Sequence, residues 1–469
     1  MPSQKYIRIQ KPKIVNRRVI VSELLYSQAV RKYFRSNKLV SEYDRSIVGL
    51  DPGILQIPAV AGVITVAWAV GADVYVEELD KTYFDSLNKI KTVLKRWHPN
   101  FSFSHVNVEN VVSSRFQNTG SGLLFTSGID SITSYIKHRQ DRPALIYIWG
   151  AEVRFDDKEK WRKVRIILSD FAGKEKAKLH VIRSNIPRID NRHVLLREFG
   201  LDWWLQVSHS IVLTGLCAPL ASTAGIKTVL IASHSAGDFK SQFGSEPEVD
   251  NNISWGDIKV VHDNFEMSRQ LKLRCLLKDY VRTHGYIFLK VCNNTRRPES
   301  NCGNCEKCLR TIGELALEGI DPNRCGLSNV SGKTFDNLKE AFLKGKLFRK
   351  KWIVESRDQF WARMVEPHFW QDIQKHIPQK IETGSWDSDH HAKEFFEWFR
   401  TFDIQEYQQR VQGKVRISLP YFLYMCSLSA LYRMPTNVQR VGNHIVDQLR
   451  QLFATAGPKD VAMSHEQSL

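Results

Sequence analysis

The chain has 469 residues and an ordinary globular composition, with 42% hydrophobic and 25% charged residues. These fractions exclude collagen-like, fibrous and wholly disordered proteins. Lysine and arginine number 67 against 50 aspartate and glutamate, so the formal net charge is +17 and the sequence pI is about 9.4. Such an excess favours polyanionic ligands, including nucleotides and nucleic acids, but does not choose among them.

Residues 1–115 are predicted to form an N-terminal α/β domain. Strand-like runs at Tyr6–Ile9 and Val19–Val21 precede a long apolar segment, Ile54–Ala72. A further strand at Asp73–Glu77 and an amphipathic helix at Asp80–Trp97 follow. The alternation of the two types favours a sheet with helices packed against it.

The apolar segment Ile54–Ala72 spans 19 residues without a charge, close to the roughly 20 that cross a bilayer. It contains Pro58 and Gly62, and a charged strand follows it at once. We therefore expect a buried core helix, with a membrane segment as the alternative. The first residues carry no continuous apolar run of the kind that secretory signals contain, so we expect a cytoplasmic location without a membrane partner.

Residues 116–330 are predicted to form a second α/β domain, in which short apolar strands alternate with helices. The expected strands are Leu123–Thr126, Ala144–Trp149, Lys178–Ile182, Thr228–Ala232 and Ile258–Val261. The expected helices are Ser131–His138, Leu205–Ala221 and Glu266–Tyr280. This order predicts a doubly wound parallel sheet whose ligands bind at the carboxyl ends of the strands.

Residues 331–469 are predicted to form a helical C-terminal region, because the strand pattern stops near residue 330. The aromatic residues of Trp361–Trp398 lie at helical spacing and are interpreted as helix core. A basic run with interleaved aromatics, Lys344–Trp352, is interpreted as a solvated helix face, with a polyanion or partner surface as the alternative. A polar tail is expected from Gly457.

The segment Leu123–Tyr135 carries the first chemical motif, a strand that enters a Ser/Gly-rich turn and then a helix. Backbone N–H groups and a helix N-terminus converge at such a turn, which is a geometry that binds phosphate. The predicted cofactor-binding residues are Thr126, Ser127, Gly128, Ile129, Asp130 and Ser131. Asp130 would hold a Mg²⁺ ion beside the phosphates. The alternative is an ordinary capped helix after a strand.

Four cysteines form the second motif, Cys292, Cys302, Cys305 and Cys308, in a C-x9-C-x2-C-x2-C arrangement. Two overlapping Cys-x-x-Cys turns and an upstream cysteine predict a closed structural Zn²⁺ site, with an iron–sulfur cluster as the alternative. The remaining cysteines stand alone in apolar or helical surroundings and are predicted to be core residues: Cys217, Cys275, Cys325 and Cys426.

Together the two motifs resemble the PP-loop ATP pyrophosphatase family, of adenine nucleotide hydrolase-like fold, and within it the 7-cyano-7-deazaguanine synthases. The resemblance covers about residues 120–325. Family members usually carry Ser-Gly-Gly-x-Asp-Ser, whereas this chain has Thr126 and Ser127 at the first two positions. Ser127 places a side chain where the family has glycine. The chain also extends further than the minimal synthase at both ends.

The resemblance implies an ATP-dependent carbon–nitrogen ligase. ATP would be cleaved between its α and β phosphates, and AMP would be transferred to the carboxylate of 7-carboxy-7-deazaguanine or a related deazapurine acid. A nitrogen nucleophile would then attack, either ammonia, with later dehydration to a nitrile, or a protein amine. Related synthase-like proteins occur in bacterial antiviral defence operons, a setting that the resemblance permits.

Polar residues at strand ends are candidates for the substrate site. Arg183 and Asn185 follow one expected strand, and Ser245 lies in a later loop. Arg269 and Lys272 are three residues apart on a predicted helix, where a cation would neutralise pyrophosphate or the substrate carboxylate. Asp130, Ser131 and Lys272 are the predicted catalytic residues. For each residue the alternative is a capping or surface role.

Two other functions remain open at this point. A tRNA-modifying PP-loop enzyme would use the positive charge to hold RNA, although nucleic acid is not required by the main interpretation. A non-catalytic nucleotide-binding scaffold would follow if Ser127 obstructs the loop. The amine acceptor, the nitrile step and the oligomeric state are not indicated by the sequence.

Overall fold

The computed structural model describes residues 4–234, 242–292, 300–345, 347, 352–356, 359–362, 367–382 and 390–407. The chain divides into two compact units. The first comprises Met1–Leu343 and Pro367–Phe402, and the second comprises Lys344–Glu366 and Asp403–Leu469. The predicted domain boundaries after residues 115 and 330 stay predictions.

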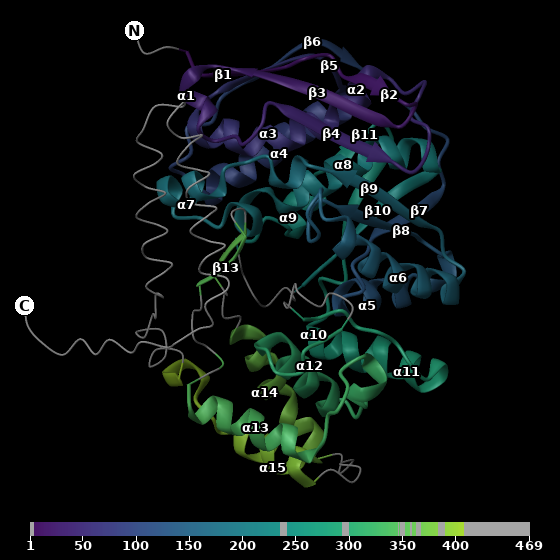
Figure 1. The fold of residues 1–469 in the computed structure, drawn as a ribbon, viewed down its shortest axis with the longest axis vertical. Coiled ribbons are helices and arrows are strands. Elements are labelled where there is room, and N and C mark those ends of the chain that lie inside the picture. Colours follow the sequence, from purple (N-terminus) through teal and green to yellow (C-terminus); the bar gives the residue numbers. More distant parts are fainter. Residues whose placement is uncertain are drawn as a thin grey trace, which may run out of the picture. The chain divides into compact units, whose positions relative to one another are not determined.

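The first unit is built on one large sheet of twelve strands in a mixed α/β fold (Figure 1). The strands are β1 (Tyr6–Ile9), β2 (Lys13–Val15), β3 (Val19–Tyr26), β4 (Lys38–Tyr43), β5 (Asp73–Asp80), β6 (Val106–Val112), β7 (Gly120–Leu124), β8 (Ala144–Trp149), β9 (Leu179–Ser184), β10 (Ile226–Ala232), β11 (Ser254–Trp255) and β12 (Ile258–Asp263). Their order is β11-β12-β10-β7-β8-β9-β4-β3-β1-β5-β6, and β2 pairs with β3.

The sheet is mostly parallel, as predicted, with antiparallel connections near its middle. Parallel pairs join β12, β10, β7, β8 and β9, and also β1, β5 and β6. The antiparallel pairs β9–β4, β4–β3 and β3–β1 connect these two groups. Strands from both sides of residue 115 therefore belong to one sheet.

The strand order reverses at β7. The chain runs outward from β7 through β8 to β9 and then returns to the opposite side of β7 for β10 and β12. In open α/β sheets, ligands bind at the carboxyl ends of the strands where the order reverses. The carboxyl ends of β7 and β10 are therefore the first place to look for a site.

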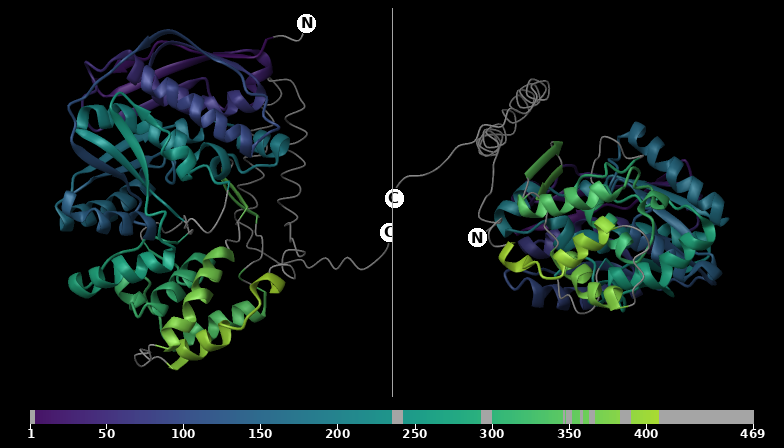
Figure 2. Two further views of the ribbon diagram at one scale, coloured as in Figure 1. Left: turned by 180° about the vertical axis from the view of Figure 1, so that it is seen from behind. Right: turned by 90° about the horizontal axis from the view of Figure 1, so that it is seen from below.

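The helices of the first unit cover this sheet and extend beyond it (Figures 1 and 2). They are α1 (Gln28–Arg31), α2 (Pro52–Leu55), α3 (Ile57–Val70), α4 (Lys81–Trp97), α5 (Ile129–Lys137), η1 (Arg139–Asp141), α6 (Lys158–Glu175), η2 (Ile186–Arg188), α7 (Arg192–Phe199), η3 (Trp204–Ser208), α8 (His209–Ala224), α9 (Pro247–Asp250), α10 (Arg269–Lys272), η4 (Leu273–Leu277), α11 (Lys278–His284), α12 (Glu306–Leu317), η5 (Pro322–Cys325), α13 (Gly332–Leu343), α14 (Pro367–Glu382) and α15 (His390–Phe399).

The apolar segment near residue 60 forms the core helix α3, and all of its residues are buried. It crosses α8 so closely that a Cβ atom built on Gly215 would lie 2.4 Å from the Ala61 Cβ. The prediction of a buried core helix is confirmed. Among the described residues, one stretch, Trp204–Ala224, has the length and apolarity to cross a membrane, and 78% of its most apolar window is buried.

The C-terminal region contains strands as well as helices, so the prediction that strands stop near residue 330 is wrong. β13 (Trp352–Ser356) and β14 (Gln359–Ala362) form an antiparallel pair in the second unit. Only two residues separate these strands in the sequence, which is the commonest loop length of a β-hairpin. The predicted basic run lies partly outside the described residues, at Lys346 and 348–351, and so does the tail from Gly457.

Helices α13, α14 and α15 share an aromatic core, which confirms the helical interpretation for their part of Trp361–Trp398. Trp370, Phe342 and Phe399 are buried, and the rings of Phe342 and Phe399 lie 5.0 Å apart. Figure 2 shows these helices gathered together. Helix α14 also packs against α10 and α12, which follow the sheet in sequence.

Candidate functional site

The predicted phosphate loop lies where the strand order reverses. β7 ends at Leu124, and α5 begins at Ile129 with Gly128 at its N-cap. Among the residues that the structure describes, no side chain caps this helix, and Asp130 stands in its first turn. The first amide groups of a helix have no partner within the helix and attract anions. The geometry is therefore suited to holding a phosphate at the N-terminal end of α5.

Ser127 adopts the left-handed backbone conformation, with φ of +62°. This region costs a non-glycine residue about 1–2 kcal/mol. The Ser127 hydroxyl donates to the Phe288 carbonyl at 2.8 Å, and the Lys290 amide donates to the Ser127 carbonyl at 2.7 Å. Ser127 is thus bonded to the segment 288–290 through its side chain and through its backbone.

The hydroxyl of Ser131 is bonded within the loop itself. It donates to the Gly128 carbonyl at 3.1 Å and accepts from the Thr126 amide at 3.4 Å. These bonds join the end of β7 to the first turn of α5. Ser131 therefore holds the shape of the loop.

Asp130 and Arg269, predicted separately, form a two-point ion pair. The Arg269 Nη2 donates to one carboxylate oxygen at 2.7 Å and the Nε to the other at 3.3 Å. The ring of Phe369, from α14, lies 3.8 Å from the guanidinium carbon. Paired and stacked arginines are strongly oriented. The structure therefore brings loop, α10 and the C-terminal helix α14 together around one guanidinium.

Lys272 is fully buried, with 0% of its surface exposed. Within the described part of the chain its ammonium makes one hydrogen bond, to the Ser233 carbonyl at the end of β10, at 2.7 Å. Burial lowers the pKa of Lys272 to about 8, although the nearby Asp130 opposes this effect. A buried cation held by a carbonyl instead of a carboxylate is suited to pairing with an anionic ligand.

Glu314, on α12, belongs to the same cluster and was not predicted from the sequence. It is 1% exposed, and its carboxylate lies 3.8 Å from the Arg269 Nη1. Burial raises the pKa of Glu314 to about 7, and the guanidinium groups of Arg269 and Arg310 oppose this rise. The apolar neighbours of Glu314 along α12 were the one available signal that it faces inward.

Asp263, at the end of β12, fixes the other end of α5. Its carboxylate accepts hydrogen bonds from Ser134, from Lys137 at 3.2 Å, and lies 3.0 Å from the His138 Nε2. Burial raises the pKa of Asp263, but hydrogen bonds from His138 and Ser134 outweigh it and hold the pKa below its ordinary value. Asp263 therefore anchors the helix that carries the loop.

Arg183, Asn185 and Ser245, predicted as substrate residues, make other contacts. Arg183 stacks 4.2 Å from the Phe155 ring and donates to the Phe155 carbonyl. Asn185 exchanges hydrogen bonds with the backbone of β4, and Ser245 donates to Asp250 at 2.8 Å. Among the described residues no hydrogen bond joins any of the three to the loop. Their role in substrate binding stays a prediction.

The four clustered cysteines are brought together as predicted, with their sulfurs within 4.8 Å of one another. The Cys292 and Cys305 sulfurs are 3.9 Å apart, as are those of Cys302 and Cys308. Gly303 makes the turn with φ of +71°, and Cys308 is buried in the first turn of α12. A helix N-terminus favours thiolates. The arrangement is a candidate metal site.

The other cysteines follow the prediction only in part. Cys217 and Cys325 are buried core residues, as expected. Cys275 is exposed on η4, so its assignment to the core is wrong. Its neighbour Arg274 is drawn toward Glu318 at 2.8 Å, and the π-turn η4 changes the face that each residue presents. Cys426 lies outside the described residues.

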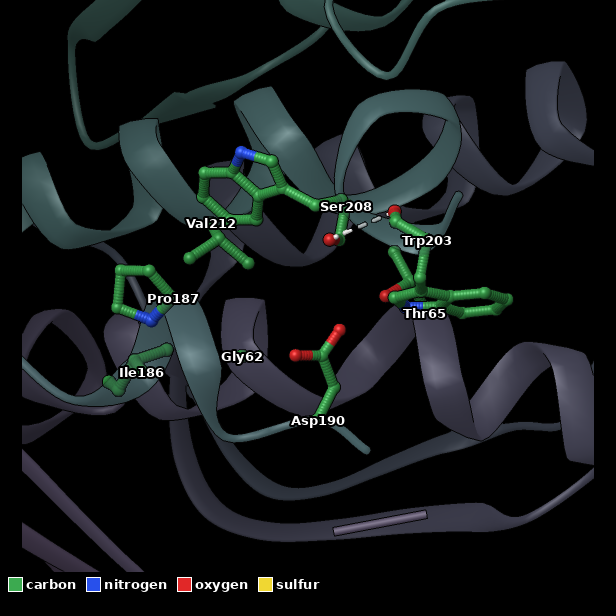
Figure 3. A pocket seen from close by; sticks show the side chains of 9 residues that line it. Gly62, Thr65, Ile186, Pro187, Asp190, Trp203, Ser208 and Val212 are labelled. Carbon is green, nitrogen blue, oxygen red and sulfur yellow. Dashed lines mark hydrogen bonds between the residues drawn. The ribbon is translucent and has the colours of Figure 1, made fainter. Parts of the chain in front are cut away.

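A shallow pocket lies elsewhere, between α3, η2 and η3 (Figure 3). The Asp190 carboxylate points into it, and the Ser208 hydroxyl is turned back to the Trp203 carbonyl at 3.2 Å. Its lining residues are Gly62, Thr65, Ile186, Pro187, Asp190, Trp203, Trp204, Ser208 and Val212. None belongs to the loop or the cysteine cluster, and Arg192 pairs with Asp190 at 3.3 Å.

Comparisons with known proteins identify no relative. No protein-family model, curated protein or solved structure matches the chain.

Changing Ser127 to Gly tests whether this side chain obstructs the loop. Glycine relieves about 1–2 kcal/mol of left-handed strain but loses a hydrogen bond worth about 0.5–1.5 kcal/mol, so we expect a net change in stability below about 1 kcal/mol. ATP affinity, measured by calorimetry, should change less than about threefold, since the hydroxyl is bonded to Phe288. A gain of tenfold or more would show that Ser127 blocks the loop.

Proposed function

We propose that this chain is an ATP-dependent carbon–nitrogen ligase of the PP-loop type. It would adenylate the carboxylate of 7-carboxy-7-deazaguanine or a related deazapurine acid. The reversal of strand order at β7 supports the finer fold assignment, a doubly wound sheet with the phosphate loop at its reversal point. The family assignment rests on the sequence motifs.

The observation that carries this proposal is the buried Lys272 beside an uncapped helix N-terminus. Lys272 reaches the end of β10, while the loop occupies the end of β7, the adjacent strand. Both groups favour negative charge at the same edge of the sheet. A triphosphate supplies that charge, and the buried ammonium would then have an ionic partner.

The residues of the loop would divide the work of binding. The amides of Gly128 to Ser131 would hold phosphate oxygens, and Lys272 and Arg269 would neutralise the charge of the leaving pyrophosphate. Asp130 is a single carboxylate, and Mg²⁺ in nucleotide sites commonly uses one or two carboxylates together with the phosphates. Asp130 fits that role when Arg269 is not paired with it.

The proposed reaction proceeds in two steps. An oxygen of the substrate carboxylate attacks the α-phosphorus of ATP, the bond to the β-phosphate oxygen breaks, and pyrophosphate leaves. An amine then attacks the acyl carbon, loses a proton, and displaces AMP to form an amide. The amine would be ammonia or a protein amine, in the cytoplasm, and the family resemblance permits a setting in antiviral defence.

We also propose that the four cysteines hold a structural Zn²⁺ ion. Zinc–sulfur bonds of about 2.3 Å place the sulfurs of a tetrahedral site about 3.8 Å apart. The Cys292–Cys305 and Cys302–Cys308 sulfur separations of 3.9 Å agree with this value. Four thiolates close the site against a fifth ligand, which is typical of structural zinc.

Changing Cys305 to Ser should remove zinc from the protein. Structural zinc contributes about 10–16 kcal/mol in small sites, so loss of one ligand should lower the melting temperature markedly and reduce the metal content from one ion per chain. Elemental analysis and thermal unfolding measure both effects. Cys275→Ser, an exposed cysteine outside the cluster, is the matched control and should change neither. Iron in the wild-type protein would contradict the assignment.

Changing Gly128 to Ala tests the phosphate loop without disturbing the fold. An added Cβ would lie 3.4 Å from the Thr126 Oγ1 and 3.7 Å from the Lys290 carbonyl, which are ordinary contacts, at φ of −80°. Alanine is a poorer N-cap than glycine, but it lowers the conformational entropy of the unfolded chain. These effects nearly cancel, so the free energy of unfolding should change by less than about 1 kcal/mol. A phosphate on the loop amides would meet this methyl group.

The measurement is production of AMP and pyrophosphate from ATP with 7-carboxy-7-deazaguanine. We expect wild-type protein to form both and Gly128→Ala to fall by about 10² in rate, because the added methyl group moves the phosphate away from the loop donors. Gly173→Ala, on α6 with nothing within 4 Å of its Cβ position, is the control and should retain full activity. ADP and phosphate as products would contradict the proposed bond cleavage.

A further inference from the structure

Arg269 lies between the carboxylates of Asp130 and Glu314 and is hydrogen-bonded to Asp130 alone of the two. Asp130 takes two hydrogen bonds from the guanidinium, at 2.7 Å and 3.3 Å. Glu314 faces the third guanidinium nitrogen, Nη1, at 3.8 Å, which is too long for a hydrogen bond. Phe369 lies against the guanidinium, with its ring centroid 3.8 Å from the central carbon. A small rotation of this group would exchange one carboxylate for the other.

Glu314 is poorly satisfied where it stands. Its side chain is 1% exposed, and neither carboxylate oxygen has a hydrogen-bond partner among the described residues. A buried polar group left without a partner costs about 1–3 kcal/mol, and a charged one costs more. Such a residue is retained more readily when another state of the site satisfies it. The Arg269 Nη1, 3.8 Å from the Glu314 carboxylate, is a donor that a small movement would bring within hydrogen-bond distance.

We propose that Glu314 is a positioning residue that takes over Arg269 when Asp130 binds the cation accompanying the phosphates. This inference rests on the proposed function, because it requires a nucleotide at the loop. Asp130 would then be released as a metal ligand, and Arg269 would remain oriented by Glu314 and Phe369. We call this change of partner the carboxylate exchange. Arg269 is paired with Asp130 before the nucleotide binds and with Glu314 afterwards.

The exchange has a consequence for protons. The charged groups that face Glu314 are Arg269 on α10, Arg310 on its own helix, Asp130 on α5 and Asp372 on α14. With Arg269 held by Asp130, burial keeps the pKa of Glu314 at about 7, so the carboxyl is largely protonated at pH 6.5. Closer approach of Arg269 lowers this pKa. Binding of Mg²⁺ with ATP should therefore release a proton from Glu314.

The test is calorimetric titration of Mg²⁺ and ATP into the full chain at pH 6.5, in two buffers of different ionisation enthalpy. The number of protons released is read from the difference between buffers. We expect wild-type protein to release up to about one proton more than Glu314→Gln. The variant should also bind ATP with Mg²⁺ about tenfold more weakly, while its affinity for ATP in EDTA stays within twofold of wild type.

The matched control is Glu318→Gln, on the residue that follows α12. Glu318 is also buried, but it pairs with Arg274 at 2.8 Å and with Gln270, and it is not placed at the loop. This variant should release the same number of protons as wild type. Equal proton release by wild type and Glu314→Gln would overturn the exchange, as would loss of the proton in both variants.

Two further outcomes separate this inference from the proposed function. Wild-type protein that fails to bind ATP would overturn both. If Glu314→Gln fails to fold, the wild-type protein still provides the test through the proton release that Mg²⁺ adds, which is the release with Mg²⁺ and ATP minus the release with ATP in EDTA, each corrected for the ligand itself. Proton uptake by Lys272, whose pKa is about 8, accompanies ATP in both titrations and cancels in this difference. The Mg²⁺-dependent release should be present at pH 6.5 and disappear at pH 8.5, where the Glu314 carboxyl is already ionised. A Mg²⁺-dependent release that is absent at pH 6.5 or unchanged at pH 8.5 would overturn the exchange while leaving nucleotide binding intact.

Discussion

The buried ammonium of Lys272 is the constraint on which the candidate site depends. A lysine with no exposed surface must be held in place and given a partner, and within the described residues the structure provides one carbonyl, that of Ser233. That bond fixes α10 against the end of β10, so Arg269, one turn earlier, faces the loop at the end of β7. The position of the buried Lys272 therefore contributes to the position of Arg269.

The C-terminal helix α14 is part of this arrangement. The Asp372 carboxylate accepts from the Gln270 amide at 2.9 Å, at the start of α10, and Phe369 lies against Arg269. Burial raises the pKa of Asp372, but its bonds with His376 and Gln270 outweigh this effect and hold the pKa below its ordinary value. The carboxylate is thus available to hold the first turn of α10. This gives part of the chain's C-terminal region a structural role near the loop.

The sequence predicted those features that depend on local patterns. β8 forms at Ala144–Trp149 because a continuous apolar run suits a strand buried on both faces. The cysteine cluster followed from ligand spacing alone. Helix α6 was missed, although Trp161, Val164, Leu168 and Phe171 repeat at helical spacing and are buried. Strand β6 gave little signal, because its residues are mostly exposed and include Asn and Glu.

Features that depend on distant contacts could not be predicted from the sequence. The antiparallel pairing of β4 with β9 joins two groups of strands into one sheet across about 140 residues of chain. Burial of Glu314 depends on Arg269 and on α14, which lies more than fifty residues later. The pairing of Asp130 with Arg269 has the same origin. Each contact depends on tertiary packing, which local sequence propensity does not predict.

Binding of ATP to Lys272→Met, compared with wild-type protein by calorimetry, tests the central claim most directly. Methionine has a similar length and no charge, so the buried site should stay folded, as replacement of a buried charge by an apolar side chain is often tolerated. The account predicts that affinity falls by about 10² or more, with a melting temperature close to wild type, while Lys278→Met at an exposed position of α11 binds normally. Unchanged affinity in Lys272→Met would contradict the claim that the buried ammonium is the partner of a nucleotide phosphate.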